Sequence, residues 1–528
     1  MTKGLALFLL ACCLPADATT YTVNPAQSIS TIQRIITRAF AGDTISFAAG
    51  TYTITGGLSL KCGVTYTGPV ATPATAILSS TFSQLGSIFS LNPGSGYADP
   101  CTQPTTIEYL NFQNSGGIYV KTSFTNLKIQ YNQFTNLPCC NGGPSNAGIY
   151  FDGGQSTSNT AQRLTDTLIQ WNTFGDINSC TSPTNSMTNT NSPENNQGNC
   201  NGIIADTTID GLTVEHNNFF HIGEGVHLTC PTASTAGQKY PCEPPNGAIT
   251  NNITVEYNDF NQIHRIPWEE QPQQSSGIVF QYNSIHDWFM AYYGSFGVSF
   301  ACCYNGTHPP NLIGSNNVII FNAVPVDASS GGRYGYGMEA MGLSAIYDHE
   351  LVQSGNFGTS IGMSWGRGPV GSMSYNTVCG GGFASARHIA DEGFGAGAPK
   401  RDGNVTESTC SAVHSVAPTI SPSSGTQSFP LTVTLTDPGY TSGPQPLGNT
   451  GIWYTTDGSA PVPGSGTARY LSSSGTFVLP AAATVKAVGM WGAANQPSSY
   501  PVGYGFVPSA VQSAHYTSGA EGQQRRPR

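Results

Sequence analysis

Short strings of alternating apolar and polar residues recur along the chain, and each string ends in an asparagine followed by any residue and an apolar residue. The asparagines are Asn132, Asn172, Asn217, Asn258, Asn283, Asn322 and Asn376. The closest two are 25 residues apart and the others 39 to 54, which indicates one short repeat with insertions of varying length. A repeat of this size with strand patterning predicts a β-solenoid.

The period-2 alternation sends every second side chain into the solenoid and the others toward solvent. The asparagine at each turn can hydrogen-bond to the backbone of the next coil. We therefore interpret these asparagines as a structural ladder and not as ligands.

The N-terminal string STIQRIITRAFAGDTISFAAGTYTI combines a short amphipathic helix with Gly-Asp-Thr-Ile and Gly-Thr-Tyr. It resembles the entry cap of right-handed parallel β-helix proteins of the pectin lyase-like group, and with the repeated coils the resemblance covers residues 19–415. It implies an all-β fold, a right-handed parallel β-helix of about ten or more coils with an N-terminal helical cap. That fold hosts hydrolases, lyases, epimerases, adhesins and phage tailspikes, so it does not fix an activity.

The catalytic signatures of that group do not carry over. The Asn-x-Asp, Asp-Asp, Gly-His-Gly and Arg-x-Lys strings of polygalacturonases are absent. The chain has Ile-Tyr-Asp-His at 346–349 in place of the pectate lyase string Trp-Ile-Asp-His. The lyase string Arg-x-Pro-x-x-Arg corresponds to residues 265–270, which end in Glu270 and precede 346–349, the reverse of the lyase order.

The pattern changes after residue 415. The strings APTISPSSGTQSFPLTVTLTDPG, GIWYTTDGSAP and ATVKAVGMW resemble the small Ig-like domain at the C-terminus of chitobiase-type and other bacterial exoenzymes. The resemblance implies a β-sandwich over residues 417–510, a spacer or attachment module, followed by a flexible tail over 511–528. Trp453 and Trp491 are expected inside this sandwich rather than on a sugar-binding surface.

The amino-acid composition limits the kinds of partner that the chain can bind. Charged residues make up 9% of the 528 residues, the net charge is −10, and Lys and Arg together number 19. A nucleic-acid-binding protein needs a basic face that this chain cannot assemble. We expect a polysaccharide as the partner, no nucleic acid and a monomeric chain.

The first residues have the pattern of a secretory signal, residues 1–18, with cleavage near Ala18. No later segment is long and apolar enough to span a bilayer, so we expect a secreted protein.

Without Cys12 and Cys13, twelve of the fourteen cysteines remain, an even number that fits disulfides in an oxidising compartment. Local spacing suggests the pairs Cys180–Cys200, Cys230–Cys242, Cys379–Cys410 and Cys62–Cys101, while Cys139, Cys140, Cys302 and Cys303 form vicinal pairs or bridge to each other.

In each coil the asparagine corner leads into a further strand. We assign to it GIYFDG (148–153), GIIAD (202–206), GVHL (225–228), PWEEQ (267–271), FMAYY (289–293) and GMEAMG (337–342). Aligning these strands makes Ile149, Ile203, Val226, Trp268 and Met338 equivalent inward positions. The next residues, Tyr150, Ile204, His227, Glu269 and Glu339, then lie outward on one face.

Two carboxylates on this face suggest a glycosidase. Glu269 and Glu339 fall two rungs apart, which separates their backbones by roughly 9.5 Å. Side-chain reach brings that toward the roughly 6.5 to 9.5 Å between the carboxyl groups of an inverting glycosidase. Residues near the same rungs are predicted to bind substrate: His227, Arg265, His286, Asp287, Tyr292 and Arg333.

No metal or cofactor is expected, because the spacing of His216, His221 and His227 matches no zinc pattern and surface or ladder roles fit these histidines better. Three functions remain open: a glycoside hydrolase that uses Glu269 and Glu339, a polysaccharide lyase, and a non-catalytic surface, adhesion or carbohydrate-binding protein. A lyase needs a base beside a calcium ion or an arginine that neutralises a uronate, and the chain is acidic. Reducing ends and ultraviolet-absorbing unsaturated ends distinguish hydrolysis from elimination.

Overall fold

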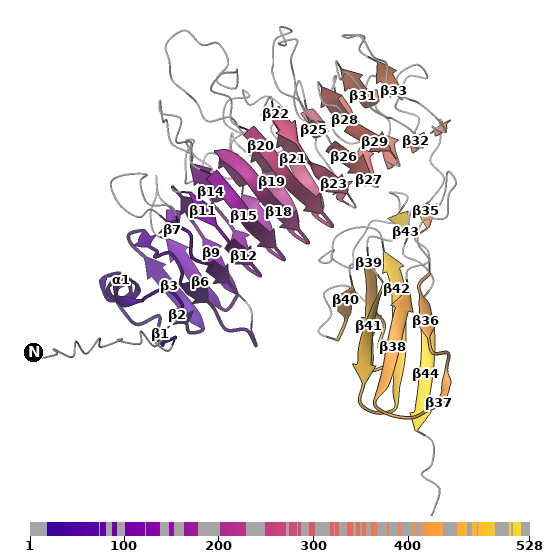
Figure 1. Cartoon of the computed structure of the whole chain (residues 1–528), viewed down its shortest axis with the longest axis horizontal. Coiled ribbons are helices and arrows are strands. Elements are labelled where there is room, and N and C mark those ends of the chain that lie inside the picture. Colours follow the sequence, from indigo (N-terminus) through magenta and orange to yellow (C-terminus); the bar gives the residue numbers. More distant parts are fainter. Residues whose placement is uncertain are drawn as a thin grey trace, which may run out of the picture.

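The computed structural model shows a long parallel β-helix followed by a small β-sandwich (Figure 1). It describes residues 18–72, 74–80, 87–91, 101–121, 123–137, 147–152, 163–177, 201–228, 249–270, 274–281, 283–286, 295–300, 317–320, 323–326, 335–341, 345–348, 351–354, 361–366, 377–379, 389–391, 405–407, 413–414, 417–436, 451–461, 467–471, 474–490, 506–507 and 511–518. Between residues 295 and 414 the description covers the strand backbones alone. The predicted signal segment lies outside these residues, apart from Ala18.

Three parallel sheets stack along the axis of the β-helix. The first sheet runs β1 (Thr20–Val23), β2 (Thr44–Phe47), β5 (Thr65–Thr67), β8 (Thr105–Glu108), β12 (Leu127–Gln130), β15 (Arg163–Gln170), β18 (Thr208–Glu215), β20 (Ile249–Glu256), β23 (Val279–Gln281), β26 (Asn317–Ile320) and β29 (Ala345–Asp348). Two short strands, β11 (Phe124–Thr125) and β22 (Gln274–Ser276), pair beside β15 and β20. The right-handed parallel β-helix predicted from the repeats is confirmed.

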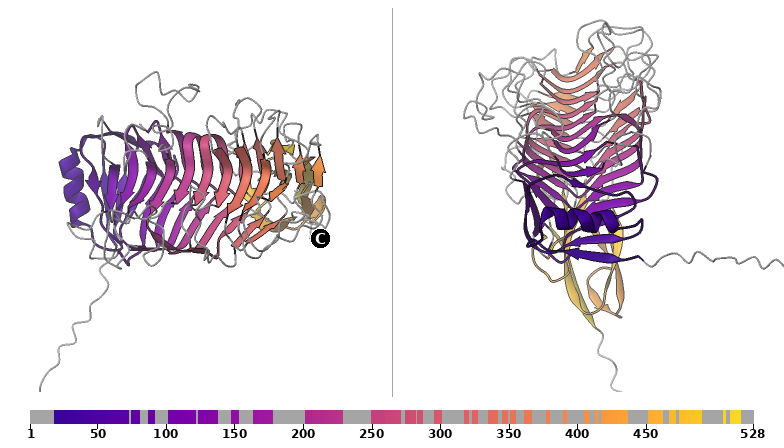
Figure 2. Two further views of the ribbon diagram at one scale, coloured as in Figure 1. Left: turned by 90° about the horizontal axis from the view of Figure 1, so that it is seen from above. Right: turned by 90° about the vertical axis from the view of Figure 1, so that its left-hand side faces the viewer.

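The second and third sheets join into one 21-stranded sheet, because β19 and β21 run through both. The second sheet comprises β3 (Gly50–Ile54), β6 (Ala76–Ser80), β9 (Leu110–Gln113), β13 (Gln133–Thr135), β16 (Thr173–Ile177), β19 (Asn218–Leu228), β21 (Asp259–Glu270), β24 (Ser284–His286), β27 (Ala323–Val326), β30 (Leu351–Ser354), β32 (Thr377–Cys379) and β34 (Val405–Glu407). The third comprises β4 (Leu58–Ser59), β7 (Ser87–Leu91), β10 (Gly116–Val120), β14 (Ala147–Asp152), β17 (Asn201–Asp206), the second halves of β19 and β21, β25 (Ser295–Phe300), β28 (Gly335–Met341), β31 (Ile361–Gly366) and β33 (Ile389–Asp391). Figure 2 shows the stack from above and from its N-terminal end.

The asparagine ladder is present between the first and second sheets. From Asn172 onward each side-chain oxygen accepts from the backbone N–H and side-chain amide of the asparagine one coil earlier, as Asn217 does from Asn172 at 2.9 and 3.0 Å. Each side-chain amide also donates to a backbone carbonyl of the previous coil, as Asn217 does to Ile169 at 2.9 Å. The ladder runs through Asn132, Asn172, Asn217, Asn258 and Asn283, while Asn322 and Asn376 lie outside the described residues.

A second repeated column lies one residue before the ladder. It stacks Tyr109, Tyr131, Trp171, His216 and Tyr257 with nearly parallel rings. All five have φ between 55° and 58°, which is uncommon for bulky residues and repeats because the same turn recurs at each coil. We call it the aromatic stack. His216 is a member of the aromatic stack, which confirms the prediction that this histidine has a ladder-like structural role.

The interior contains a third column of rings that packs against glycines. Phe112, Phe134, Phe174, Phe219 and Phe260 stack at 4.7 to 4.9 Å between centroids. A Cβ at Gly148 would lie 2.7 Å from the Phe174 ring and 2.8 Å from the Gly202 carbonyl oxygen. Glycine is therefore required where the third sheet passes the phenylalanine column.

The N-terminal end is closed by the predicted helical cap, α1 (Ile29–Arg38), which buries Ile32 and Ile36 against the first coils (Figure 2). Ser28 caps the helix, because its hydroxyl accepts from the Thr31 backbone N–H.

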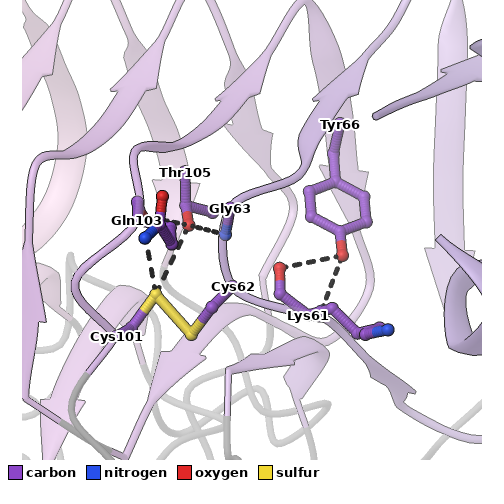
Figure 3. The surroundings of a disulfide bond; sticks show 7 residues. All are labelled: Lys61, Cys62, Gly63, Tyr66, Cys101, Gln103 and Thr105. Atoms are coloured by element: carbon purple, nitrogen blue, oxygen red, sulfur yellow. Dashed lines mark hydrogen bonds between the residues drawn. A yellow bond between two sulfur atoms is a disulfide. The ribbon is translucent and has the colours of Figure 1, made fainter. Parts of the chain in front are cut away.

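The disulfide Cys62–Cys101 confirms one predicted pair and joins two coil edges (Figure 3). The other predicted pairs each include a cysteine outside the described residues.

The C-terminal unit consists of two small sheets around a shared core. One contains β36 (Thr419–Ser421), β38 (Leu431–Thr436) and β41 (Gly475–Leu479), and the other contains β37 (Gly425–Gln427), β44 (Gln512–Ser518), β42 (Ala483–Met490), β39 (Gly451–Thr455) and β40 (Arg469–Leu471). A short pair, β35 (Val413–His414) with β43 (Phe506–Val507), lies beside them. Residues 512–518 belong to this unit rather than to the predicted tail, because β44 pairs with β42. The Ig-like identity of the unit stays a prediction.

Trp453 of the C-terminal unit is 6% exposed, as expected for a buried aromatic residue. Trp491 lies outside the described residues. Tyr470 of the same unit packs edge-on against Trp171 and His216, at 5.6 and 5.4 Å between ring centroids. The sandwich therefore contacts the aromatic stack. No helix in the described part of the chain is long and apolar enough to cross a membrane.

Candidate functional site

The register of the third sheet aligns the outward residues of successive coils. Tyr119, Tyr150, Ile204, His227, Glu269, Ser299 and Glu339 are Cα partners in turn. We call this set the Glu269 column. Glu269 and Glu339 lie two rungs apart with Ser299 between them, and the inward column runs through Val226, Trp268, Val298 and Met338. The predicted register of the two glutamates is therefore the observed one.

One strand assignment was wrong. We predicted from the sequence that FMAYY (289–293) forms the strand in the coil after Trp268. The strand at that rung is instead β25, whose Val298 pairs with Trp268. Both segments are apolar and patterned as strands, so alternation alone does not choose between them. The pairing of strands decides it, and it places Gly297 at the position of Gly148 and Gly202 in earlier coils and of Pro267 in the coil before.

Glu269 is enclosed rather than solvated. It is 3% exposed and follows Trp268, which is fully buried in the core. The Glu269 Oε2 lies 3.4 Å from His227 Nε2 in the coil before it. His227 is 14% exposed and is the more accessible member of the pair.

A third charged residue, Glu224, completes this cluster. It is not among the site residues predicted from the sequence. Its side chain is fully buried, and its Oε2 lies 3.0 Å from His227 Nδ1. Glu224 stands between two glycines within the buried run 222–226, whose other members are apolar residues and glycines. That pattern was the available signal, because a carboxylate is rarely buried without a partner.

The pairing of β19 with β21 is irregular beside this cluster. Ile222 pairs with Ile263 and Glu224 with Ile266, so β21 contains one residue more than β19 between these pairs. The extra residue falls at His264 and Arg265, which makes a β-bulge. Bulges often occur next to active sites, where they re-aim side chains.

The remaining predicted site residues lie outside the Glu269 column, or their side chains lie outside the described residues. His286 ends β24 and pairs with Asn261, so it lies on the second sheet and outside the Glu269 column. Asp287, Tyr292 and Arg333 lie outside the described residues, as do the side chains of Arg265, His286 and Glu339. Their predicted roles stay predictions.

The same face carries polar aromatic residues nearer the N-terminus. Tyr119 and Tyr150 stack at 5.7 Å between ring centroids, and the Tyr119 hydroxyl donates to Asp152 Oδ2. Both tyrosines are partly exposed. The Glu269 column therefore joins two tyrosines, an imidazole and two carboxylates along the axis of the β-helix.

Glu224, His227 and Glu269 are also the described residues whose ligand atoms come close enough to hold a metal ion, within 4.8 Å of one another. The two carboxylates, however, face different nitrogens of the imidazole. One ligand atom from each of the three residues could still reach a common ion, so the cluster offers up to three protein ligands.

Comparison with known proteins finds relatives in fold alone. No protein-family model and no curated protein matches the sequence. Among solved structures, a tailspike protein gp49 from Acinetobacter baumannii bacteriophage Fri1, a capsular polysaccharide depolymerase, is 9% identical with a TM-score of 0.38, over 94% of this chain and 77% of that one. The pectate lyase Pel9A is 12% identical with a TM-score of 0.34, over 72% and 79%.

An alginate lyase from Paenibacillus sp. str. FPU-7 is 14% identical with a TM-score of 0.27, and the match covers 74% of this chain and 98% of that one. These similarities are too low to carry an argument about activity.

Proposed function

We propose that this chain cleaves the glycosidic bonds of a polysaccharide that lies along the Glu269 column, with Glu269 and Glu339 as the two reacting carboxyl groups. The observation that supports this proposal is the register, which separates the two backbones by two rungs, roughly 9.5 Å. An inverting glycosidase needs room for a water molecule between its carboxyl groups, which lie roughly 6.5 to 9.5 Å apart.

The two glutamates occupy different positions in the proposed reaction. Glu269 is shielded from bulk water and donates a proton to the leaving glycosidic oxygen. Glu339 takes a proton from the water that attacks the anomeric carbon, so one bond to carbon forms as the other breaks and the configuration inverts. The tyrosines at the N-terminal end of the column would contact further sugar residues.

The substrate class follows from charge and from location. A chain of net charge −10 with 19 basic residues favours a neutral or weakly charged polysaccharide over a polyuronate. The Cys62–Cys101 disulfide fits a protein that works outside the cytoplasm.

A panel of polysaccharides tests the proposal by two assays, one for new reducing ends and one for ultraviolet-absorbing unsaturated ends. Reducing ends without absorbance support hydrolysis. Glu269→Gln and Glu339→Gln should each lower the rate by about 10² to 10⁴-fold with little change in melting temperature. Glu108→Gln, on the first sheet, removes a carboxylate that accepts from Gln130 and should leave the rate unchanged. If both column variants stay active, these glutamates are not the reacting groups.

A polysaccharide lyase is the second candidate, and the position of His227 is the observation that favours it. This imidazole lies on the column itself, partly exposed, and could abstract a proton next to a uronate carboxylate. Unsaturated products that vanish in His227→Gln would favour the lyase over the hydrolase. A chain that binds polysaccharides but yields neither product would be a non-catalytic binding protein.

A further inference from the structure

Glu224, His227 and Glu269 form a largely buried cluster of two carboxyl groups and one imidazole. Glu224 and Glu269 are 0% and 3% exposed, and Trp268 beside them is fully buried. Burying a carboxylate costs several kcal/mol unless it is paired. Two carboxylates around one imidazole can be neutralised by one proton on the imidazole and another shared proton.

The imidazole stands between the carboxylates and connects them. Nδ1 lies 3.0 Å from Glu224 Oε2, and Nε2 lies 3.4 Å from Glu269 Oε2. These are close ion-pair contacts, and small rotations of the carboxyl groups would align them as hydrogen bonds, as often happens when a substrate binds. A metal ion would use one nitrogen only, whereas a proton relay uses both.

Apart from one another, the residues of the cluster are paired in register with uncharged residues. In the coil before, Asn201 pairs with Glu224 and Ile204 with His227. In the coils after, Ile266 pairs with Glu224, and Ser299 with Glu269. The further charged positions on β21 and β28 are Asp259, which is buried at the start of β21, and His264, Arg265, Glu270 and Glu339, whose side chains lie outside the description.

We propose that Glu224 is a positioning residue that holds the Nδ1–H of His227, so that Nε2 exchanges a proton with Glu269 between turnovers. This inference rests on the proposed function of Glu269. After Glu269 has given its proton to the leaving group, the imidazolium passes its Nε2 proton to the Glu269 carboxylate. The neutral imidazole keeps Nδ1–H toward Glu224, and its Nε2 takes a new proton from a water molecule that enters the column after the product leaves, which restores the starting state.

The relay has a defined effect on pH dependence. The negative charge of Glu224, 3.0 Å from His227 Nδ1, favours the protonated imidazole. Glu224→Gln keeps the shape and removes the charge. The pH at which activity falls on the alkaline side, where His227 no longer carries the proton that it passes to Glu269, should therefore move to lower pH by about one unit or more.

Glu224→Gln is tested by pH–rate profiles of kcat/KM, with Glu108→Gln as the matched carboxylate control, which should keep the wild-type profile. A uniform loss of rate with an unmoved alkaline limb would show that Glu224 only supports the fold, and would overturn the proposal. Loss of activity in a chelator that a divalent ion restores would also overturn it, because the cluster would then hold a metal.

A second measurement needs no activity and no folded variant of Glu224. Nitrogen-15 imidazole NMR of the whole protein, with His227 assigned by its loss in His227→Gln, reports which nitrogen carries hydrogen in the neutral form. The relay requires Nδ1–H. A neutral His227 with hydrogen on Nε2 overturns the relay, whatever becomes of the proposed hydrolysis. Nδ1–H together with no cleavage of any polysaccharide would instead overturn the proposed function.

Discussion

The asparagine ladder and the Glu269 column run along the same β-helix, and they differ in how their sequence changes from coil to coil. From Asn132 to Asn283 the ladder residue is asparagine at every coil, and each one bonds to the next. Along the Glu269 column the residue changes at every coil after Tyr150, from isoleucine to histidine, glutamate, serine and glutamate.

The difference has a physical cause. In a stack of equivalent coils a residue that bonds to its own counterpart must recur, because replacing one member leaves two neighbours with buried polar groups that lack partners. A residue that contacts a bound molecule has no such need. The repeated columns therefore hold the fold together, and an isolated charged residue in a non-repeating column is a candidate for chemistry. Glu224, the one charge in a buried stretch of β19, follows the same reasoning.

The largest effect on stability is expected from breaking the ladder. Asn217→Leu removes the acceptor of the Asn172 backbone N–H and the donor to the Ile169 carbonyl, both buried. At about 1 to 3 kcal/mol for each buried group left without a partner, the free energy of unfolding should fall by on the order of 4 kcal/mol. Denaturant unfolding measures it. Thr213→Val, on the neighbouring strand β18, should change it by less than about 0.5 kcal/mol. A ladder variant as stable as wild type would contradict the structural role.

An intermediate effect is expected from His216 in the aromatic stack. Burial lowers the pKa of His216 to about 4 from the ordinary value of 6.5. The unfolded chain thus binds this proton at higher pH than the folded chain. Stability is complete above pH 6.5 and is lost as the pH falls toward 4, by about 3 kcal/mol in total.

His216→Tyr should remove that part of the acid sensitivity, because tyrosine already occupies the equivalent turn position at Tyr131 and Tyr257. Denaturant unfolding at pH 7 and pH 4.5 compares the two chains. His515→Gln changes an exposed histidine of the C-terminal unit and should keep the wild-type difference. An unchanged pH difference in His216→Tyr would show that His216 does not titrate as a buried group.

The smallest effect on stability is expected in the non-repeating column. Ser299 lies between Glu269 and Glu339 in register, so Ser299→Ala should change the free energy of unfolding by less than about 0.5 kcal/mol. Ser299→Phe should keep the fold and suppress cleavage, because its ring would occupy the space between the two carboxyl groups. Thermal unfolding and a reducing-end assay measure the two effects. Full activity in Ser299→Phe would place the substrate elsewhere.

Much of the architecture was predictable from the sequence, for a simple reason. Each coil repeats the same local solution, so alternation of apolar residues and the recurring Asn-x-apolar corner identify the strands, the ladder and the inward positions from Ile149 to Met338. The pairing of Cys62 with Cys101 and the helical cap at Ile29–Arg38 were likewise within reach of spacing and amphipathicity. Register follows because a slip by one residue would turn the apolar side chains outward.

The tertiary structure alone decided three other features. The coil after Trp268 is built from β25 rather than from residues 289–293, because Val298 pairs with Trp268, and alternation fits both segments equally well. The contact of Tyr470 with His216 joins segments that share no sequence pattern. The cluster of Glu224, His227 and Glu269 depends on distances across two coils, and whether a glutamate is solvated or enclosed is a property of its neighbours in space, which no spacing along the chain records.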